Sequence, residues 1–172
     1  AVTSLAAMAF LPAGHAPGRG RYGDVVDRAL AFVLSRVKPN GYIIDEGYTS
    51  HGPMYGHGFA TLFLAEAYGM SDRDDLRDKL EKAVQLIVGS QNDEGGWRYE
   101  PNSTAADISV TVCQMMALRA GRNAGISVPR ETVDRCVEYI TRSQNADGGF
   151  RYQLTPGGES RFPRSAAAVV AL

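Results

Sequence analysis

Apolar residues recur at steps of three and four in three stretches of the chain, and each stretch ends at a serine. The serines are Ser35, Ser90 and Ser143. The apolar positions before them are Val26, Ala29, Leu30 and Val33, then Leu76, Leu80, Ala83, Val84 and Ile87, and then Val133, Cys136, Val137 and Ile140. This spacing places the apolar side chains on one face of an α-helix. The sequence has no sustained period-two alternation, so the pattern predicts an all-α protein.

A second kind of segment follows each of these amphipathic stretches and is apolar nearly all round. The three segments are GHGFATLFLAEAYG (56–69), DISVTVCQMMALRAG (107–121) and SAAAVVAL (165–172). Such helices are typically buried on both sides. We expect the first two to end at Gly69 and Gly121 in the left-handed conformation. Start signals for the amphipathic helices are a capping-box variant at residues 71–74 and a first-turn proline, Pro129.

The turn between the two kinds of helix is repeated in the sequence. SQNDEGGWRY (90–99) recurs 53 residues later as SQNADGGFRY (143–152), with seven of the ten positions identical. A fainter copy, SRVKPNGY, begins at Ser35 and has Tyr42 in the place of Trp97 and Phe150. A repeat of this length predicts a repeat architecture, with units at about 20–69, 71–121 and 128–172.

The length of 172 residues suits one domain with a real core. Residues 1–15 align with the apolar helix of the repeat, and the sequence also closes inside such a helix. We therefore expect residues 1–172 to be a single repeat domain and a fragment of a longer protein. Because uncapped ends of a repeat array expose apolar faces, we expect self-association, with a homodimer as one form.

Charge and cysteine content limit the kinds of partner that the sequence predicts. The formal net charge is −1 and there is no run of Lys or Arg, which argues against nucleic acid or an anionic membrane as the main partner. No apolar segment is long enough to span a bilayer. Cys113 and Cys136 occupy apolar positions of different predicted helices, which indicates buried reduced thiols and is compatible with a cytoplasmic protein. No zinc-type spacing is present, so we expect no metal and no cofactor.

The repeated turn carries a Gln-x3-Gly-x-aromatic pattern with an isoleucine four residues before each glutamine. Its residues are Gln91, Gly95 and Trp97 after Ile87, and Gln144, Gly148 and Phe150 after Ile140. The pattern resembles the QW motif of the squalene/hopene cyclase and protein prenyltransferase superfamily. In the first copy, Arg36 stands for the glutamine and Gly41 is retained beside Tyr42. The resemblance implies an α/α toroid, here a partial ring of about three helical hairpins. It also implies structural roles in which the glutamine caps a helix end and the aromatic ring stacks on it.

The resemblance also allows this sequence to be compared with the catalytic and zinc-binding motifs of the family. Class II terpene cyclases carry Asp-x-Asp-Asp-Thr-Ala at the start of an inner helix, and its threonine matches Thr111. The acidic positions then fall at Asp107, Ser109 and Val110, so a serine stands where the family has its proton donor. The zinc ligands of the prenyltransferases fall at Asp107, Ser109 and Arg164, and one ligand of three cannot hold zinc. The acidic run 72–75 lies at an outer-helix start, where carboxylates suit the helix dipole.

By the same resemblance, the loops 43–56, 98–106 and 151–164 meet at one rim of the inner helices. They bring together the following polar and aromatic residues: Asp45, Glu46, Tyr48, His51, Tyr55, His57, Tyr99, Asp107, Tyr152, Arg161 and Arg164. Tyr55, His57, Tyr99, Asp107, Arg161 and Arg164 are the ligand-binding candidates, and His57 and Asp107 the weak catalytic ones. Arg161 and Arg164 suit a diphosphate or a salt bridge with Asp107. His57, placed as the equivalent of Ser109, is either a general base or a structural residue.

Three functions are compatible with these patterns and with the resemblance. The first is a non-classical member of the superfamily that binds an apolar or isoprenoid-like ligand, or a partner protein, at its inner helices. The second is an active isoprenoid cyclase or prenyltransferase whose catalytic residues lie outside this segment. The third is a purely structural repeat array. The sequence leaves open which of these applies, and therefore whether the chain is an enzyme.

Overall fold

The described residues, 1–47 and 52–172, form seven α-helices and no strand in this computed structural model. The helices are α1 (Val2–Met8), α2 (Gly23–Ser35), α3 (Pro53–Tyr68), α4 (Asp75–Gly89), α5 (Ile108–Asn123), α6 (Arg130–Arg142) and α7 (Phe162–Ala171). This confirms the predicted all-α class. No helix in the described part of the chain is both long and apolar enough to cross a membrane.

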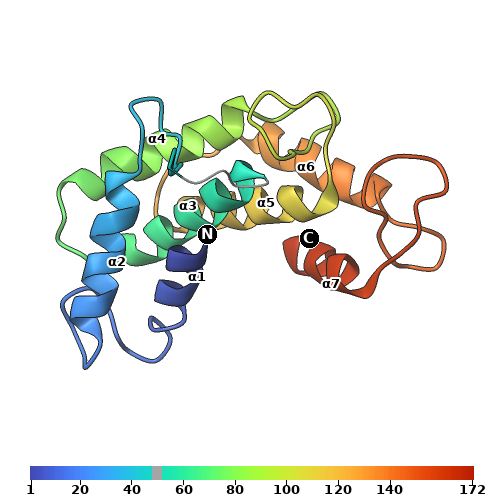
Figure 1. Cartoon of the computed structure of the whole chain (residues 1–172). Helices are drawn as coiled ribbons and strands as arrows, with labels where there is room; N and C mark the ends of the chain where they lie inside the picture. Colours follow the sequence, from blue (N-terminus) through green and yellow to red (C-terminus); the bar gives the residue numbers. More distant parts are fainter. Residues whose placement is uncertain (48–51) are drawn as a thin grey trace.

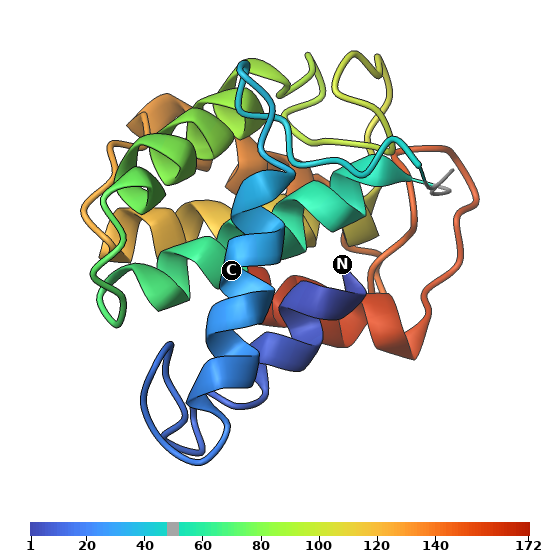
Figure 2. The ribbon, with the colours of Figure 1, turned by 60° about the vertical axis from the view of Figure 1, so that its left-hand side comes forward.

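The helices form two layers that alternate along the chain. The inner layer contains α1, α3, α5 and α7, and each packs on the next inner helix. The outer layer contains α2, α4 and α6. Figures 1 and 2 show α3 and α5 at the centre, with α4 on one side of them and α1 and α7 on the other.

The core lies between the layers. α3 and α5 bury residues around most of their circumference, as their apolar sequences predict, while α2 and α4 bury the predicted stripes, for example Leu30 and Leu80. In α6, Tyr139 is fully buried and the predicted core residue Val137 is 36% exposed. α7 differs from α3 and α5, because it buries only Ala168 and Ala171.

Two predicted helix ends are wrong in detail. Gly69 follows α3 with an ordinary negative φ of −78°, and Gly121 lies inside α5. α5 continues to Asn123, and the left-handed glycine is Gly125, at φ +82°. The capping box before α4 is also not made, because no side chain caps that helix. Pro129 is the N-cap residue of α6 rather than its first helical residue.

Each turn after an outer helix has a glycine with positive φ, followed two residues later by a backbone N–H bound to an inner helix. The glycines are Gly41, Gly95 and Gly148, with φ of 87°, 91° and 82°. The donors and their acceptors are Ile43 to His57 Nδ1 at 3.2 Å, Trp97 to Thr111 Oγ1 at 3.0 Å, and Phe150 to Ser165 Oγ at 2.9 Å. We call this hydrogen bond the turn clip.

The turn clip corrects the alignment of the first copy. Ile43, not Tyr42, has the place of Trp97 and Phe150. A β-bridge joins Val37 to Ile43 in the first turn, and the equivalent bridge joins Gln144 to Phe150 in the third turn. Val37, not Arg36, therefore stands at the glutamine position. Sequence similarity missed this register because the first copy lacks both marker residues.

Polar groups of the second turn join neighbouring outer helices. Gln91 Nε2 donates to the carbonyls of Gly95, at 2.8 Å, and of Thr132 in α6, at 2.9 Å. The indole N–H of Trp97 donates to the Ile87 carbonyl in the last turn of α4 at 2.8 Å. The helix-end cap that the resemblance implies is therefore made by the tryptophan, and the glutamine links α4 to α6.

The glycines allow the turns to touch the next outer helix. A Cβ on Gly41 would collide with the Lys82 carbonyl of α4, and a Cβ on Gly95 would collide with the Arg135 carbonyl of α6. A Cβ on Gly148 meets no described atom within 4 Å. The second and third turns therefore provide a matched pair for testing this contact.

We predict that Gly95→Ala destabilises the protein far more than Gly148→Ala. Both substitutions place a side chain in the left-handed region, which costs about 1–2 kcal/mol. Only Gly95→Ala also forces α6 away from the turn, so its total loss should exceed about 3 kcal/mol. Urea unfolding measures both, and equal losses would show that the contact with α6 contributes nothing.

Substitutions at two fully buried threonines of the inner helices test the contribution of the turn clip to stability. Thr111→Val leaves the Trp97 N–H without its acceptor and should cost about 1–3 kcal/mol. Thr61 has no hydrogen-bond partner for its hydroxyl among the described residues, so Thr61→Val should change stability by less than about 0.5 kcal/mol or increase it. Urea unfolding free energies compare the two. A Thr111→Val protein as stable as the wild type would contradict a structural role for the clip.

Candidate functional site

Four residues that the sequence placed at the rim meet at the N-terminal ends of α3 and α5. They are Tyr55, Tyr99, Asp107 and Tyr152, and Ser109 completes the group. The Tyr55 hydroxyl lies 2.5 Å from Ser109 Oγ, and Ser109 Oγ donates to Asp107 Oδ1 at 2.7 Å. The Tyr99 and Tyr152 hydroxyls lie 2.6 Å apart, and the rings of Tyr55 and Tyr99 are 6.1 Å apart. We call these five residues the tyrosine–aspartate cluster.

Asp107 is held in the cluster by its role at the start of α5. Its backbone is extended, at φ −133° and ψ 152°, and its Oδ1 accepts from the N–H groups of Ser109 and Val110 at 3.0 and 2.9 Å. This is the preferred arrangement for an aspartate N-cap. The carboxylate is fully buried, and Oδ2 has no hydrogen-bond partner among the described residues. None of the ion pairs of the described residues includes it, so the predicted salt bridge to Arg161 or Arg164 is not formed in this structure.

Two tyrosines of the cluster, Tyr55 and Tyr152, are kept neutral. Burial raises the pKa of Tyr55 and of Tyr152, and the negative charge of Asp107 raises both further. The hydrogen bond with Tyr99 also raises the pKa of Tyr152. At neutral pH the cluster therefore contains phenols that can donate or accept hydrogen bonds.

Helical spacing from the cluster defines a mostly apolar face on the two central inner helices. Its half-exposed residues follow helical spacing and are Tyr55, Phe59 and Leu62 on α3 and Ser109, Cys113 and Met116 on α5. We call this surface the inner face. Phe59, Leu62, Cys113 and Met116 were not among the predicted site residues, although their steps of three and four from Tyr55 and Ser109 carried the signal. The face is polar at one end and apolar beyond it.

His57 lies in the core and not in the cluster. Its Nδ1 accepts the turn-clip hydrogen bond from Ile43, and its Nε2 lies 3.2 Å from the Ala83 carbonyl of α4, to which the neutral ring donates. The sequence predicted that His57 is equivalent to Ser109. Because His57 accepts a turn-clip hydrogen bond, its counterpart is instead Thr111. Tyr55 is the counterpart of Ser109. With both nitrogens bonded and the side chain fully buried, the geometry favours the structural alternative over a general base.

The two arginine candidates contact their own loop. Arg161 is paired with Glu159 at 2.6 Å. Arg164 donates to the Phe150 carbonyl at 2.9 Å and to the Glu159 carbonyl, and its guanidinium lies 6.0 Å from the centre of the Tyr152 ring. Arg164 therefore borders the cluster, whereas Arg161 is exposed.

The remaining rim residues lie elsewhere or outside the described part. Asp45 pairs with Arg36 at 3.9 Å, and Glu46 pairs with Lys38 at 2.9 Å, so both acidic residues are bound within the turn that follows α2. Tyr48 and His51 lie outside the described residues. In the described ranges, no three His, Cys, Asp or Glu side chains come together as metal ligands would.

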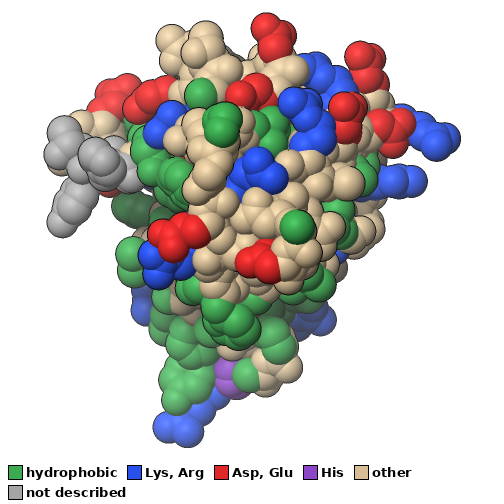
Figure 3. All heavy atoms as spheres, turned by 90° about the vertical axis from the view of Figure 1, so that its right-hand side faces the viewer, with side chains coloured by type: hydrophobic (Ala, Val, Ile, Leu, Met, Phe, Trp, Pro, Cys, Tyr) green, Lys and Arg blue, Asp and Glu red, His purple; other side chains and the backbone are tan. Residues whose placement is uncertain are grey.

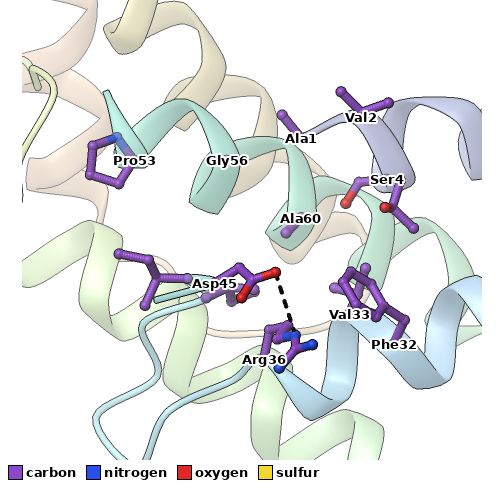
Figure 4. A pocket seen from close by; sticks show the side chains of 13 residues that line it. Ala1, Val2, Ser4, Phe32, Val33, Arg36, Asp45, Pro53, Gly56 and Ala60 are labelled. Atoms are coloured by element: carbon purple, nitrogen blue, oxygen red, sulfur yellow. Dashed lines mark ion pairs between the residues drawn. The ribbon is translucent and has the colours of Figure 1, made fainter. Parts of the chain in front are cut away.

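A separate pocket of about 520 Å³ lies beside the first turns of α3 (Figure 4). It is bounded by the start of α1, the end of α2, residues 43–45 and the α3 residues Pro53, Gly56 and Ala60. Its volume is within the range of small-molecule sites. Figure 4 shows the Arg36–Asp45 ion pair at its edge. Asp45 is the one predicted rim residue of the described ranges that lines it.

Burial makes the two thiols poor nucleophiles. It raises the pKa of Cys113 and of Cys136 to about 12, and Asp107 adds to the effect at Cys113. Both cysteines are free. At neutral pH both thiols are therefore protonated and act as small apolar groups. Cys136 is buried, as the sequence predicts, whereas Cys113 is only partly buried.

Comparisons with known proteins relate the chain to terpenoid cyclases. It is 28% identical to the drimenyl diphosphate synthase of Streptomyces showdoensis over 158 residues, which are 92% of this chain and 28% of that protein. It is 25% identical to the drimenyl diphosphate synthase of Streptantibioticus cattleyicolor over 138 residues, which are 78% of this chain and 24% of that protein.

A third relative belongs to the same broad group. The squalene–hopene cyclase of Zymomonas mobilis is 26% identical over 111 residues, which are 52% of this chain and 16% of that protein. The chain thus spans about a quarter or less of the length of these curated relatives. No protein-family profile matches it. The similarity supports a terpenoid-cyclase-like protein at the level of the superfamily.

We predict a pH dependence of stability that belongs to His57. Burial lowers the pKa of His57 from 6.5 to about 4, so the unfolded chain binds a proton in a pH range where the folded protein does not. Stability is therefore full above about pH 6.5 and falls as the pH decreases towards 4. The loss should be about 2 kcal/mol by pH 5.

The matched variant is His57→Gln, which keeps one acceptor and one donor for Ile43 and Ala83 but does not titrate. Urea unfolding of both proteins between pH 7.5 and 5 gives the comparison. The variant should lose about 2 kcal/mol less stability over this range. Identical pH profiles would show that His57 is not buried as the structure has it.

Proposed function

We propose that this chain is part of a terpenoid-cyclase-like protein and that its inner face binds an apolar, isoprenoid-like molecule. The observation that carries the proposal is the form of the inner face, with the tyrosine–aspartate cluster at one end and Phe59, Leu62 and Met116 beyond it. Ligand sites commonly combine an apolar surface with a few convergent polar groups. The similarity to a drimenyl diphosphate synthase and to a squalene–hopene cyclase supports the choice of ligand class.

The architecture that we infer is an arc of an α/α toroid, with three outer–inner hairpins related by the turn clip. The recurrence of the clip at Ile43, Trp97 and Phe150 supports this. In such a ring the N-terminal ends of the inner helices, where the cluster lies, form one mouth. The QW residues then have structural roles, which the contacts of Gln91 and Trp97 support.

The ends of the arc support an additional proposal, self-association. Apolar side chains at both ends are exposed, including Val2 at 82% and Phe162 at 86%. Figure 3 shows hydrophobic side chains gathered over the lower part of the face on the α7 side, while charged side chains gather over its upper part. Two chains closing one ring would cover such surfaces.

Catalysis by this segment is not part of the proposal. In the position that matches the proton donor of the cyclases, Ser109 is a hydroxyl that donates to Asp107. An active cyclase or transferase would therefore need its acid or its metal ligands from residues outside this segment. The purely structural array predicts no ligand at all, so a binding experiment separates it from the proposal.

We predict that farnesol, used as an isoprenoid probe, binds to the 172-residue chain at the inner face. Isothermal titration calorimetry gives the affinity. Leu62→Ala and Met116→Ala should each weaken binding about fivefold or more, because each removes about 1–2 kcal/mol of apolar contact. Phe32→Ala is the matched control, because this exposed aromatic residue lines the separate pocket.

The outcomes of this experiment are distinct. Weaker binding in the two inner-face variants with an unchanged Phe32→Ala protein supports the proposal. The reverse pattern assigns the ligand to the α1–α2–α3 pocket and contradicts it. No binding to the wild-type chain favours the structural array.

A further inference from the structure

We propose that the ligand of the inner face carries a hydrogen-bond-donating head group without negative charge, such as an alcohol or an amine, and not a diphosphate. The inference rests on the proposed function and specifies the polar end of the same site. It follows from the charge of the cluster, the direction of its hydrogen bonds and the state of the neighbouring helix ends.

The Asp107 carboxylate has no cationic partner among the described residues, and its stabilising contacts are hydrogen bonds at the start of α5. Asp107 is fully buried, takes part in no ion pair of the described residues, and has one carboxylate oxygen without a partner there. A buried carboxylate favours a neutral or positive group beside it and disfavours an anion, because little solvent screens the charge. A diphosphate would place several negative charges next to it.

The direction of the hydrogen bonds is set by the carboxylate. An ionised Asp107 can only accept, so the Ser109 hydroxyl donates to it. Ser109 has then used its only hydrogen, so in the 2.5 Å contact the Tyr55 hydroxyl is the donor. The Tyr55 oxygen is left with acceptor capacity alone. A ligand group that bonds there must itself donate, which a hydroxyl or an ammonium does and an ionised phosphate does not.

The helix ends that usually bind phosphate are already occupied. Phosphates bind the free N–H groups at helix N-termini. In α5 the first N–H, on Ile108, donates to the Tyr152 carbonyl at 2.9 Å, and the next two, on Ser109 and Val110, donate to Asp107. In α3, Pro53 has no N–H and Met54 donates to the Tyr99 carbonyl at 3.1 Å. Neither central inner helix therefore presents its N-terminal donors to a ligand.

The arginines near the cluster must also be considered. Arg161 is paired with Glu159, and Arg164 donates to two loop carbonyls. The guanidinium of Arg98 lies over the Tyr99 ring, 5.3 Å from its centre. Arg98 is the cation that an anionic ligand would use, and it is therefore included in the test.

The test compares three probes with the same farnesyl chain on the 172-residue protein. They are farnesol, farnesylamine and farnesyl diphosphate, and calorimetry at constant ionic strength gives their affinities. We expect the alcohol or the amine to bind at least about tenfold more tightly than the diphosphate. A preference for the alcohol identifies a neutral head group, and a preference for the amine identifies a cationic one.

Three variants test whether the tyrosine–aspartate cluster causes the preference between head groups. Asp107→Asn keeps a good N-cap residue but removes the charge, and should reduce the discrimination against the diphosphate about tenfold. Ser109→Ala frees the Tyr55 hydroxyl to donate and should shift the preference in the same direction, and it serves if Asp107→Asn does not fold. Asp78→Asn removes an equal charge from the exposed surface of α4, and should leave the preference unchanged.

Two outcomes would overturn the inference. Diphosphate binding as tight as that of the alcohol, lost in Arg98→Gln, would show an anion site and leave the proposed function intact. A wild-type preference that persists in both Asp107→Asn and Ser109→Ala would show that the cluster does not select the head group. Failure of all three probes to bind would instead contradict the proposed function itself.

Discussion

The arrangement of this protein depends on one hydrogen bond, donated by a backbone N–H in each turn and accepted by a side chain near the start of the following inner helix. The N–H belongs to the residue two positions after a left-handed glycine, and it would otherwise be buried without a partner, which is costly. The acceptors differ in chemistry, since His57, Thr111 and Ser165 take the same place. What the fold requires there is an acceptor, and a threonine, a serine or a neutral histidine provides it. Because the clip aligns each inner helix with the preceding turn, it also aligns Tyr55 with Ser109 and so assembles the tyrosine–aspartate cluster.

Much of this fold could be predicted from the sequence, because it depends on local patterns. Apolar spacing predicted the buried stripes of α2 and α4, and the repeated SQN…RY turn marked the positions of Trp97 and Phe150. The first turn was misaligned by one residue, because Val37 and Ile43 share neither amide nor aromatic character with their counterparts. The hydrogen bond from Ile43 to His57, between residues 14 positions apart, and the bridge from Val37 to Ile43 reveal the register. A separate misalignment, by two residues in the following inner helix, made His57 the counterpart of Ser109 instead of Thr111.

The polar end of the candidate site was largely predictable in its residues but not in how they are connected. Asp107, Tyr55, Tyr99 and Tyr152 followed from the expected rim of the inner helices. The hydrogen bond between Tyr55 and Ser109 joins residues 54 apart, and it depends on how closely α3 and α5 pack, which no local pattern contains. For the two arginines, the sequence showed the charge but not the groups that bind it. Their charge suggested an anion site, but Glu159 and the loop carbonyls occupy Arg161 and Arg164 in the folded chain.

The glycines of the turns have a geometric consequence for the whole molecule. At Gly41 and Gly95, turn backbone meets the carbonyl of the next outer helix with no side chain between them. In the described part of the chain the closest helix packing is between the inner helices α3 and α5, so each outer helix meets the preceding outer helix mainly through its turn. A larger residue at either glycine would push the turn away from the next outer helix without separating α3 from α5. The spacing of the outer layer therefore depends on two hydrogen atoms, one at each turn.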